Sequence, residues 1–115
     1  MFDVSAEEAL EEIAKRGPDD HRFLLRLARV ALDMGYPIVC QRLLIRARTV
    51  IGGPDQRAEL ATSFAELASH FTRVGDLGAA RLSLERSLRI NPSDHTAREQ
   101  LHALGTERYA EHQVS

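Results

Sequence analysis

The chain has 115 residues, a formal net charge of -2, 43% hydrophobic and 5% aromatic residues, and a single cysteine. This length suits one folded domain, residues 1–115, and one cysteine excludes an internal disulfide. No uncharged apolar run approaches the roughly 18 residues of a membrane-spanning helix, and the first residues lack the layout of a secretory signal peptide. We therefore expect a cytoplasmic protein.

Apolar residues recur at helical spacing along the chain, and turn residues separate the helices that this spacing predicts. The first helix begins with a capping box, Ser5-Ala6-Glu7-Glu8, and ends before Gly17-Pro18. The expected helices span residues 5–16, 19–34, 37–50, 55–74, 77–90 and 93–111. No segment shows sustained two-residue alternation with β-branched enrichment, so we expect an all-α fold without a sheet.

The most regular pattern surrounds Gly75-Asp76. Before it, four residues lie at i, i+3, i+4 and i+7 on one helix stripe: Phe64, Leu67, Ala68 and Phe71. Glycine tolerates the left-handed conformation that ends a helix, and aspartate can cap the next one. A second stripe follows at Leu77, Ala80, Leu84, Ser87 and Leu88, and Asn91-Pro92 ends it. The pattern predicts a helical hairpin.

Two weaker copies of this pattern occur in the chain. When the sequence is aligned with itself so that Ala28 matches Ala68, the following residues match positions of the pattern: Leu24, Leu27, Ala28, Ala31, Gly35, Cys40, Leu44 and Ala47. A partial third copy starts at Ser93, where Leu101 takes the position of Leu67. The chain therefore carries an internal, degenerate repeat.

These residues and their spacing resemble the tetratricopeptide repeat (TPR) family. The resemblance implies antiparallel helical hairpins stacked as a short α-solenoid that serves as a non-catalytic protein-binding scaffold. It divides the chain into an N-terminal helix at 5–16, a degenerate repeat at 19–50, the best-matching repeat at 55–92 and a capping helix at 93–111. The step from Ala28 to Ala68 exceeds the family's usual period of about 34 residues, which implies extra residues around 51–56. We expect them to lengthen the helix that begins near Pro54.

In the TPR fold, the first helix of each hairpin lines a concave groove that holds the partner. By this resemblance the first hairpin contributes Arg22, Leu25, Arg26, Arg29 and Leu32, and the second contributes Thr62, Ala65, Glu66, Ser69, Thr72 and Arg73. One TPR subgroup grips a peptide carboxylate with Lys and Asn residues. At those clamp positions this chain has Leu25, Arg29, Glu66, Thr96 and Gln100, which disfavours a two-carboxylate clamp.

Charge is unevenly distributed. Residues 1–20 carry seven acidic and two basic residues, whereas residues 21–50 carry six arginines and one aspartate. Arg22, Arg26 and Arg29 share one helix stripe that could bind an acidic peptide through charge-assisted contacts. The alternatives are a solvated face or pairing with the protein's own acids. The acidic helix at 5–16 could itself dock on this stripe, or it could pack on the first hairpin through its apolar side.

Other classes of function have weaker support. Self-association through an apolar surface near Phe23, Leu32, Tyr36 and Ile38 is the main alternative to a peptide groove. Arg42, Arg46 and Arg48 extend the basic segment, but a pI of 6.2 without interleaved aromatic residues disfavours nucleic acid as a partner.

Catalytic and metal-binding motifs give no positive signal. His95, Glu99 and His102 could share one helix face, but a single Glu-x-x-His does not make a metal site. Cys40 occupies the position that Ala80 has in the other hairpin, which indicates a small core residue. No HExxH, CxxC pair, GxSxG or phosphate-binding glycine loop occurs. We therefore expect no catalytic, cofactor or metal site.

Overall fold

Six α-helices and no strand make up the part of the chain that the computed structural model describes, which is the backbone of residues 5–114 and the side chains of residues 5–105. The helices are α1 (Ala6–Arg16), α2 (His21–Asp33), α3 (Pro37–Arg48), α4 (Pro54–Arg73), α5 (Leu77–Ile90) and α6 (His95–Val114). They confirm the all-α expectation, and their ends differ from the expected ones by at most three residues. Within residues 5–114, no helix combines the length and the apolar character needed to cross a membrane.

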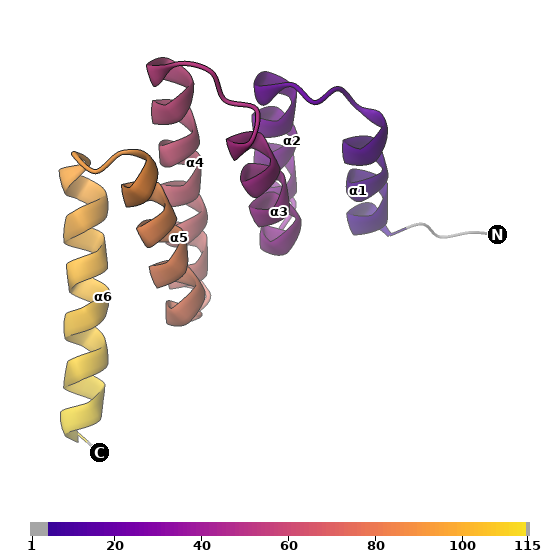
Figure 1. Ribbon diagram of the computed structural model, residues 1–115. Helices are drawn as coiled ribbons and strands as arrows, with labels where there is room; N and C mark the ends of the chain where they lie inside the picture. Colours follow the sequence, from indigo (N-terminus) through magenta and orange to yellow (C-terminus); the bar gives the residue numbers. More distant parts are fainter. Residues whose placement is uncertain (1–4, 115) are drawn as a thin grey trace.

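The helices form a row with α1 at one end and α6 at the other (Figure 1). α2 packs along α3 and α4 packs along α5, while α3 contacts α4 and α5 contacts α6. The Cα atoms span 51 × 41 × 17 Å, so the row is about two helices thick. In such a flat arrangement, most helices keep one side exposed.

Two glycines make the tight connections inside the row. Gly35 and Gly75 both have a φ of 86°, in the left-handed region. The following residues close the helix ends: Tyr36 N–H donates to the Ala31 carbonyl at 2.8 Å, and Asp76 N–H donates to the Phe71 carbonyl at 2.9 Å. The Asp76 side chain then accepts from the N–H of Ala79, which starts α5 immediately. These short connections keep α3 against α2 and α5 against α4.

The core runs along the row between these pairs of helices. Its largest fully buried apolar side chains are Phe64, Leu24, Leu44, Leu60, Leu67, Leu84 and Val39. Small residues occur where helices approach closely, and the buried Ser87 of α5 donates a hydrogen bond of 2.7 Å to the Ala61 carbonyl of α4. Cys40 is 2% exposed and Ala80 is 0% exposed, so both take the role of a small core residue.

α1 contacts both α2 and α3. Leu10 and Ala14 of α1 are buried against the neighbouring helices. Arg46 of α3 donates to the Ala14 carbonyl at 2.5 Å and to Asp19 at 2.8 Å, and Arg42 donates to Glu11 at 2.6 Å. Part of the charge asymmetry along the sequence is therefore neutralised inside the fold.

Candidate functional site

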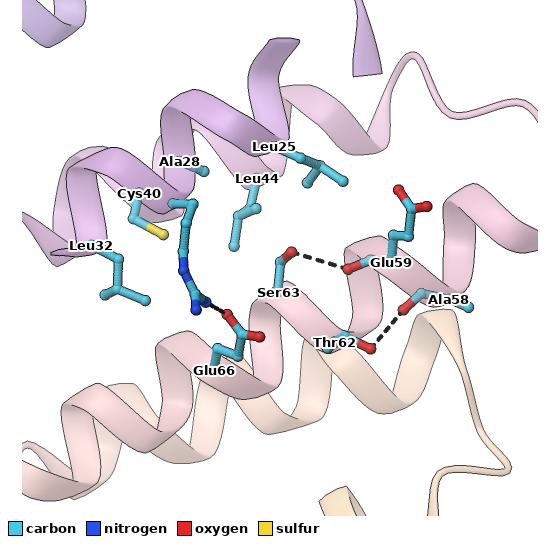
Figure 2. A pocket seen from close by; sticks show the side chains of 11 residues that line it. Leu25, Ala28, Leu32, Cys40, Leu44, Ala58, Glu59, Thr62, Ser63 and Glu66 are labelled. Carbon is cyan, nitrogen blue, oxygen red and sulfur yellow. Dashed lines mark hydrogen bonds and ion pairs between the residues drawn. The ribbon is translucent and has the colours of Figure 1, made fainter. Parts of the chain in front are cut away.

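A cleft opens between α2 and α4 and is closed at its base by α3 (Figure 2). It contains a cavity of about 460 Å³. Its walls comprise Leu25, Ala28, Arg29 and Leu32 from α2 and Ala58, Glu59, Thr62, Ser63 and Glu66 from α4, over Cys40 and Leu44 of α3. Neighbouring helices usually fill such a space with side chains, so an open cleft of this size is a candidate binding site.

The lining of this cavity is mostly apolar in character. Thr62 and Ser63 donate their hydroxyl hydrogens to the carbonyls of Ala58 and Glu59, each at 3.0 Å, so neither is a free donor (Figure 2). Burial raises the pKa of the Cys40 thiol to about 12, with Glu66 adding to the effect, so this thiol is neutral at physiological pH. The cavity therefore suits an apolar side chain.

An ion pair crosses the cleft from α2 to α4. Arg29 donates to the Glu66 carboxylate, and its Nε lies 3.6 Å from Asp33 Oδ1. Beyond this pair a second cavity, of about 930 Å³, continues toward the C-terminal ends of both helices, where Ser69, His70 and Arg73 line it. The pair thus divides the cleft into an apolar part and a more polar part.

A third cavity, of about 310 Å³, lies on the other side of α4. It is lined by Ala68, Ser69, Thr72 and Arg73 of α4, Leu84 of α5, and Gln100, Ala103 and Leu104 of α6. Ser69 and Arg73 therefore border cavities on both sides of the same helix.

The groove residues expected from the sequence divide into two groups. Those that line a cavity are Leu25, Arg29, Leu32, Thr62, Glu66, Ser69, Thr72 and Arg73. Arg22, Arg26 and Ala65 line none of the three. Arg22 and Arg26 are exposed, and neither forms an ion pair with any residue whose side chain the structure describes.

Some lining residues were not among the sequence-based candidates. Ala58 and Glu59 line the first cavity because α4 starts at Pro54 and is 20 residues long. The signal for them was the insertion between the repeats, which lengthens this helix. Near the same end, His21 is 4% exposed and its Nε2 lies 3.4 Å from Glu59 Oε2. No sequence pattern marked that contact.

The acidic α1 lies at one end of the row beside α2 and α3, on the side of this pair that faces away from α4 (Figure 1). Its Glu11 pairs with Arg42 of α3, and Glu12 pairs with Arg16 inside α1 at 3.0 Å. The structure thus places α1 on the first helix pair and not in the cleft. Among the residues that the structure describes, no group of three or more His, Cys, Asp or Glu could hold a metal ion.

The chain matches no protein-family model, and searches among curated proteins and among solved structures give no match either. The resemblance to the TPR family therefore stays a prediction from the repeat pattern. The cavities beside α4 and the charges around them are the features of the molecule that bear on its function.

Proposed function

We propose that this protein is a non-catalytic interaction module, a short TPR-like α-solenoid of stacked antiparallel hairpins that binds a peptide segment. The segment would lie across α2, α4 and α6, which are the first helices of successive units. The observation that carries this proposal is the open cleft between α2 and α4 over Cys40 and Leu44. A concave, mostly apolar site with a few charged groups at its edge is the usual form of a binding pocket.

Two arginines of α2 favour an acidic partner. Arg22 and Arg26 follow the exposed edge of α2, and both lack an acidic partner among the described side chains. Arg29, by contrast, already pairs with Glu66 and lies near Asp33. Guanidinium groups bind carboxylates in a planar, two-point geometry, so the two unpaired arginines offer specific contacts to an acidic segment.

The test uses fluorescence anisotropy with short labelled peptides that contain leucines and either glutamates or lysines. The acidic peptide is expected to bind more tightly, and its affinity should fall at high salt because exposed charges are screened. Replacing Arg22 and Arg26 together by alanine should lower the affinity about fivefold to tenfold, since each exposed pair contributes up to about 1 kcal/mol.

The matched control is the double variant Arg48→Ala and Arg89→Ala. It removes the same charge from exposed positions on α3 and α5 that line none of the three cavities. Its affinity for the acidic peptide should stay within about a factor of two, since distant charges act only through screened long-range attraction. Equal losses in both double variants would show that the arginines beside the cleft make no specific contact.

A second candidate function is self-association, which the exposed apolar residues of the first helix pair favour. Val30, Met34 and Ile38 are 46%, 49% and 47% exposed, close in sequence to the half-buried Phe23 and Tyr36. Exposed apolar side chains that gather on one surface often mark an interface. Light scattering at several concentrations distinguishes the two functions, because a monomer at all concentrations excludes self-association.

A further inference from the structure

α4 contacts its neighbours in the row through two different sides. Thr62 and Glu66 line the cleft that α4 shares with α2. Ala68 and Thr72 line the cavity that it shares with α5 and α6. The residues toward α2 and the residues toward α6 therefore form two different stripes of the same helix.

α2 carries the same two stripes, because the internal repeat relates it to α4. Its counterparts of the residues toward α6 are Ala28 and Leu32, and both line the cleft toward α4. Its counterparts of the residues toward α2 are Arg22 and Arg26. These two arginines therefore mark the side of α2 that faces away from α4, toward the end of the row where α1 lies (Figure 1).

α1 leaves a strip of this side of α2 uncovered. Arg22 and Arg26 are exposed, and no acidic side chain that the structure describes pairs with either of them. Val30 and Met34 follow at the same four-residue spacing and are exposed as well. This free strip, Arg22, Arg26, Val30 and Met34, combines two unpaired cations with two apolar side chains.

We propose that the free strip docks an acidic amphipathic helix of another protein. The strip lies outside the cleft between α2 and α4, so this site goes beyond the proposed function. Its ligand is a helix because the corresponding stripe of α4 packs against a helix, α2. The ligand is acidic because the two arginines have room for carboxylates and form charge-assisted hydrogen bonds with them.

The contact between α2 and α4 specifies which side chains the docked helix carries. Arg29 of α2 pairs with Glu66, whose counterpart on the free strip is Arg26. The docked helix therefore needs an acidic residue at the position that corresponds to Arg29. Leu25 and Leu32, four residues before and three residues after Arg29, line the same cleft, so apolar residues belong at those positions.

The docked helix should run in the same direction as α2. The apolar cavity joins residues 25–32 of α2 to residues 58–66 of α4, and the polar cavity joins residues 29–35 to residues 66–74. α2 and α4 therefore run in the same direction, and repeating their packing on the free strip keeps the order of the pattern. Its apolar residue at i+3 then lies near Val30 and Met34.

A second copy of this chain does not supply the pattern. None of its acidic residues has Leu, Ile, Val, Met, Phe or Tyr both four positions before it and three positions after it. The complementary helix therefore belongs to a different protein.

Helical peptides test the pattern. Alanine-rich peptides of about 20 residues are long enough to form helices in water. The reference peptide carries leucine, glutamate and leucine at i−4, i and i+3. One control peptide has lysine in place of glutamate, and another keeps the composition but has the glutamate at i+2, on a different face. Fluorescence anisotropy should give the reference peptide an affinity about tenfold above that of either control.

A charge exchange identifies the arginine that pairs with the peptide. Arg26→Glu should lower the affinity of the reference peptide about tenfold and raise that of the lysine peptide. Arg89→Glu, at an exposed position of α5, is the matched control and should change neither affinity more than about twofold. Val30→Gln should weaken the reference peptide about fivefold, whereas the similarly exposed Leu82→Gln on α5 should not. Circular dichroism checks that every variant is folded.

Thr62→Phe separates this site from the cleft. The substitution fills the cavity between α2 and α4 from an exposed position, so it should weaken the flexible acidic peptides of the proposed function and leave the reference helix unaffected. Failure of the flexible peptides alone refutes the cleft and leaves the docked helix standing. Loss of the reference helix in Thr62→Phe would place it in the cleft and overturn the free strip as its site.

Three other results would overturn the inference. They are equal affinities for all helical peptides, a loss in Arg26→Glu that the lysine peptide does not restore, and a dimer in light scattering that Arg26→Glu dissociates. The last result would show that a second copy occupies the strip. Binding that depends on the face of the glutamate and follows the charge exchange supports the docked helix.

Discussion

Arg29 of α2 and Glu66 of α4 form an ion pair across the cleft that separates these two helices. Their side chains are 57% and 43% exposed, so solvent screens the pair and it adds little to the stability of the fold. Among the arginines of the predicted stripe, Arg29 lines the cleft, and its guanidinium is already engaged by Glu66. An acidic partner must compete with Glu66 for this guanidinium.

Glu66→Gln should therefore strengthen the binding of an acidic peptide, by about threefold to fivefold, because Arg29 becomes available to the ligand. The free energy of unfolding should change by less than about 0.5 kcal/mol. Glu85→Gln is the matched control, since it breaks the Arg81–Glu85 pair of 3.7 Å on α5. Anisotropy titrations compare the two variants, and equal affinities for both would show that Arg29 takes no part in binding.

The pairing of Arg29 with Glu66 shows where prediction from the sequence stops. Helix α5 was predicted to the residue, because Asp76 caps its start and Asn91-Pro92 ends it through local chemistry. The six-helix order followed from equally local signals. The ion pair joins residues 37 positions apart, and its formation depends on how α2 lies against α4. Only the packed structure contains that information.

The same limit applies to the site. Periodicity placed Leu25, Arg29 and Thr62 on groove-facing stripes, and all three line the cleft. It also selected Arg22 and Arg26, which line none of the cavities. A stripe of residues at helical spacing is wider than the strip of the helix surface that faces the neighbouring helix. No stripe predicted the cavities themselves, since their volume depends on the distance between helices.

Substitution of Gly75 tests the turn between α4 and α5. Its φ of 86° strains any residue that has a Cβ, so Gly75→Ala should lower the free energy of unfolding by about 1 kcal/mol. Gly78 is the matched control, because it lies near the start of α5 and an added Cβ would find its nearest atom 3.9 Å away. Gly78→Ala should raise stability by about 0.5 kcal/mol. Urea denaturation measures both, and a loss at Gly78 that equals the loss at Gly75 would refute the turn assignment.

Arg46 is expected to hold α1 in place. Its side chain is 33% exposed and donates to the Ala14 carbonyl and to Asp19, so Arg46→Ala should cost about 1–2 kcal/mol. The exposed Arg48 makes no such contacts with described residues, and Arg48→Ala should cost less than about 0.5 kcal/mol. Amide hydrogen exchange should rise in α1 for the first variant alone. Unchanged exchange in α1 would contradict this role for Arg46.

Cys40 should make the stability of the protein sensitive to alkaline pH. Burial, reinforced by Glu66 and opposed by Arg29, raises the pKa of its thiol from 9.0 to about 12. Below pH 9 the thiol is neutral in both states, and above it only the unfolded chain releases the proton. The stabilisation is therefore complete below pH 9 and decreases as the pH rises toward 12, by about 2 kcal/mol at pH 10.5.

Urea denaturation at pH 8 and pH 10.5 checks this expectation in the wild-type protein and in Cys40→Ala. The wild-type protein should lose about 2 kcal/mol more than the variant between the two pH values, because the variant lacks the thiol. Groups common to both proteins cancel in the comparison. Parallel losses in the two proteins would show that the thiol ionises equally easily in the folded state.

The most direct measurement for the central claim is an NMR titration of the labelled protein with a short acidic peptide that contains leucine. Amide shifts are expected to concentrate at residues that line the cavities on the two sides of α4, among them Leu25, Thr62, Ser69 and Ala103, and at the adjacent Arg26. The exposed positions of α1 and α5 should change little. Shifts centred on α1 or α5, or no shifts at millimolar peptide, would contradict the assignment of this groove as the binding site.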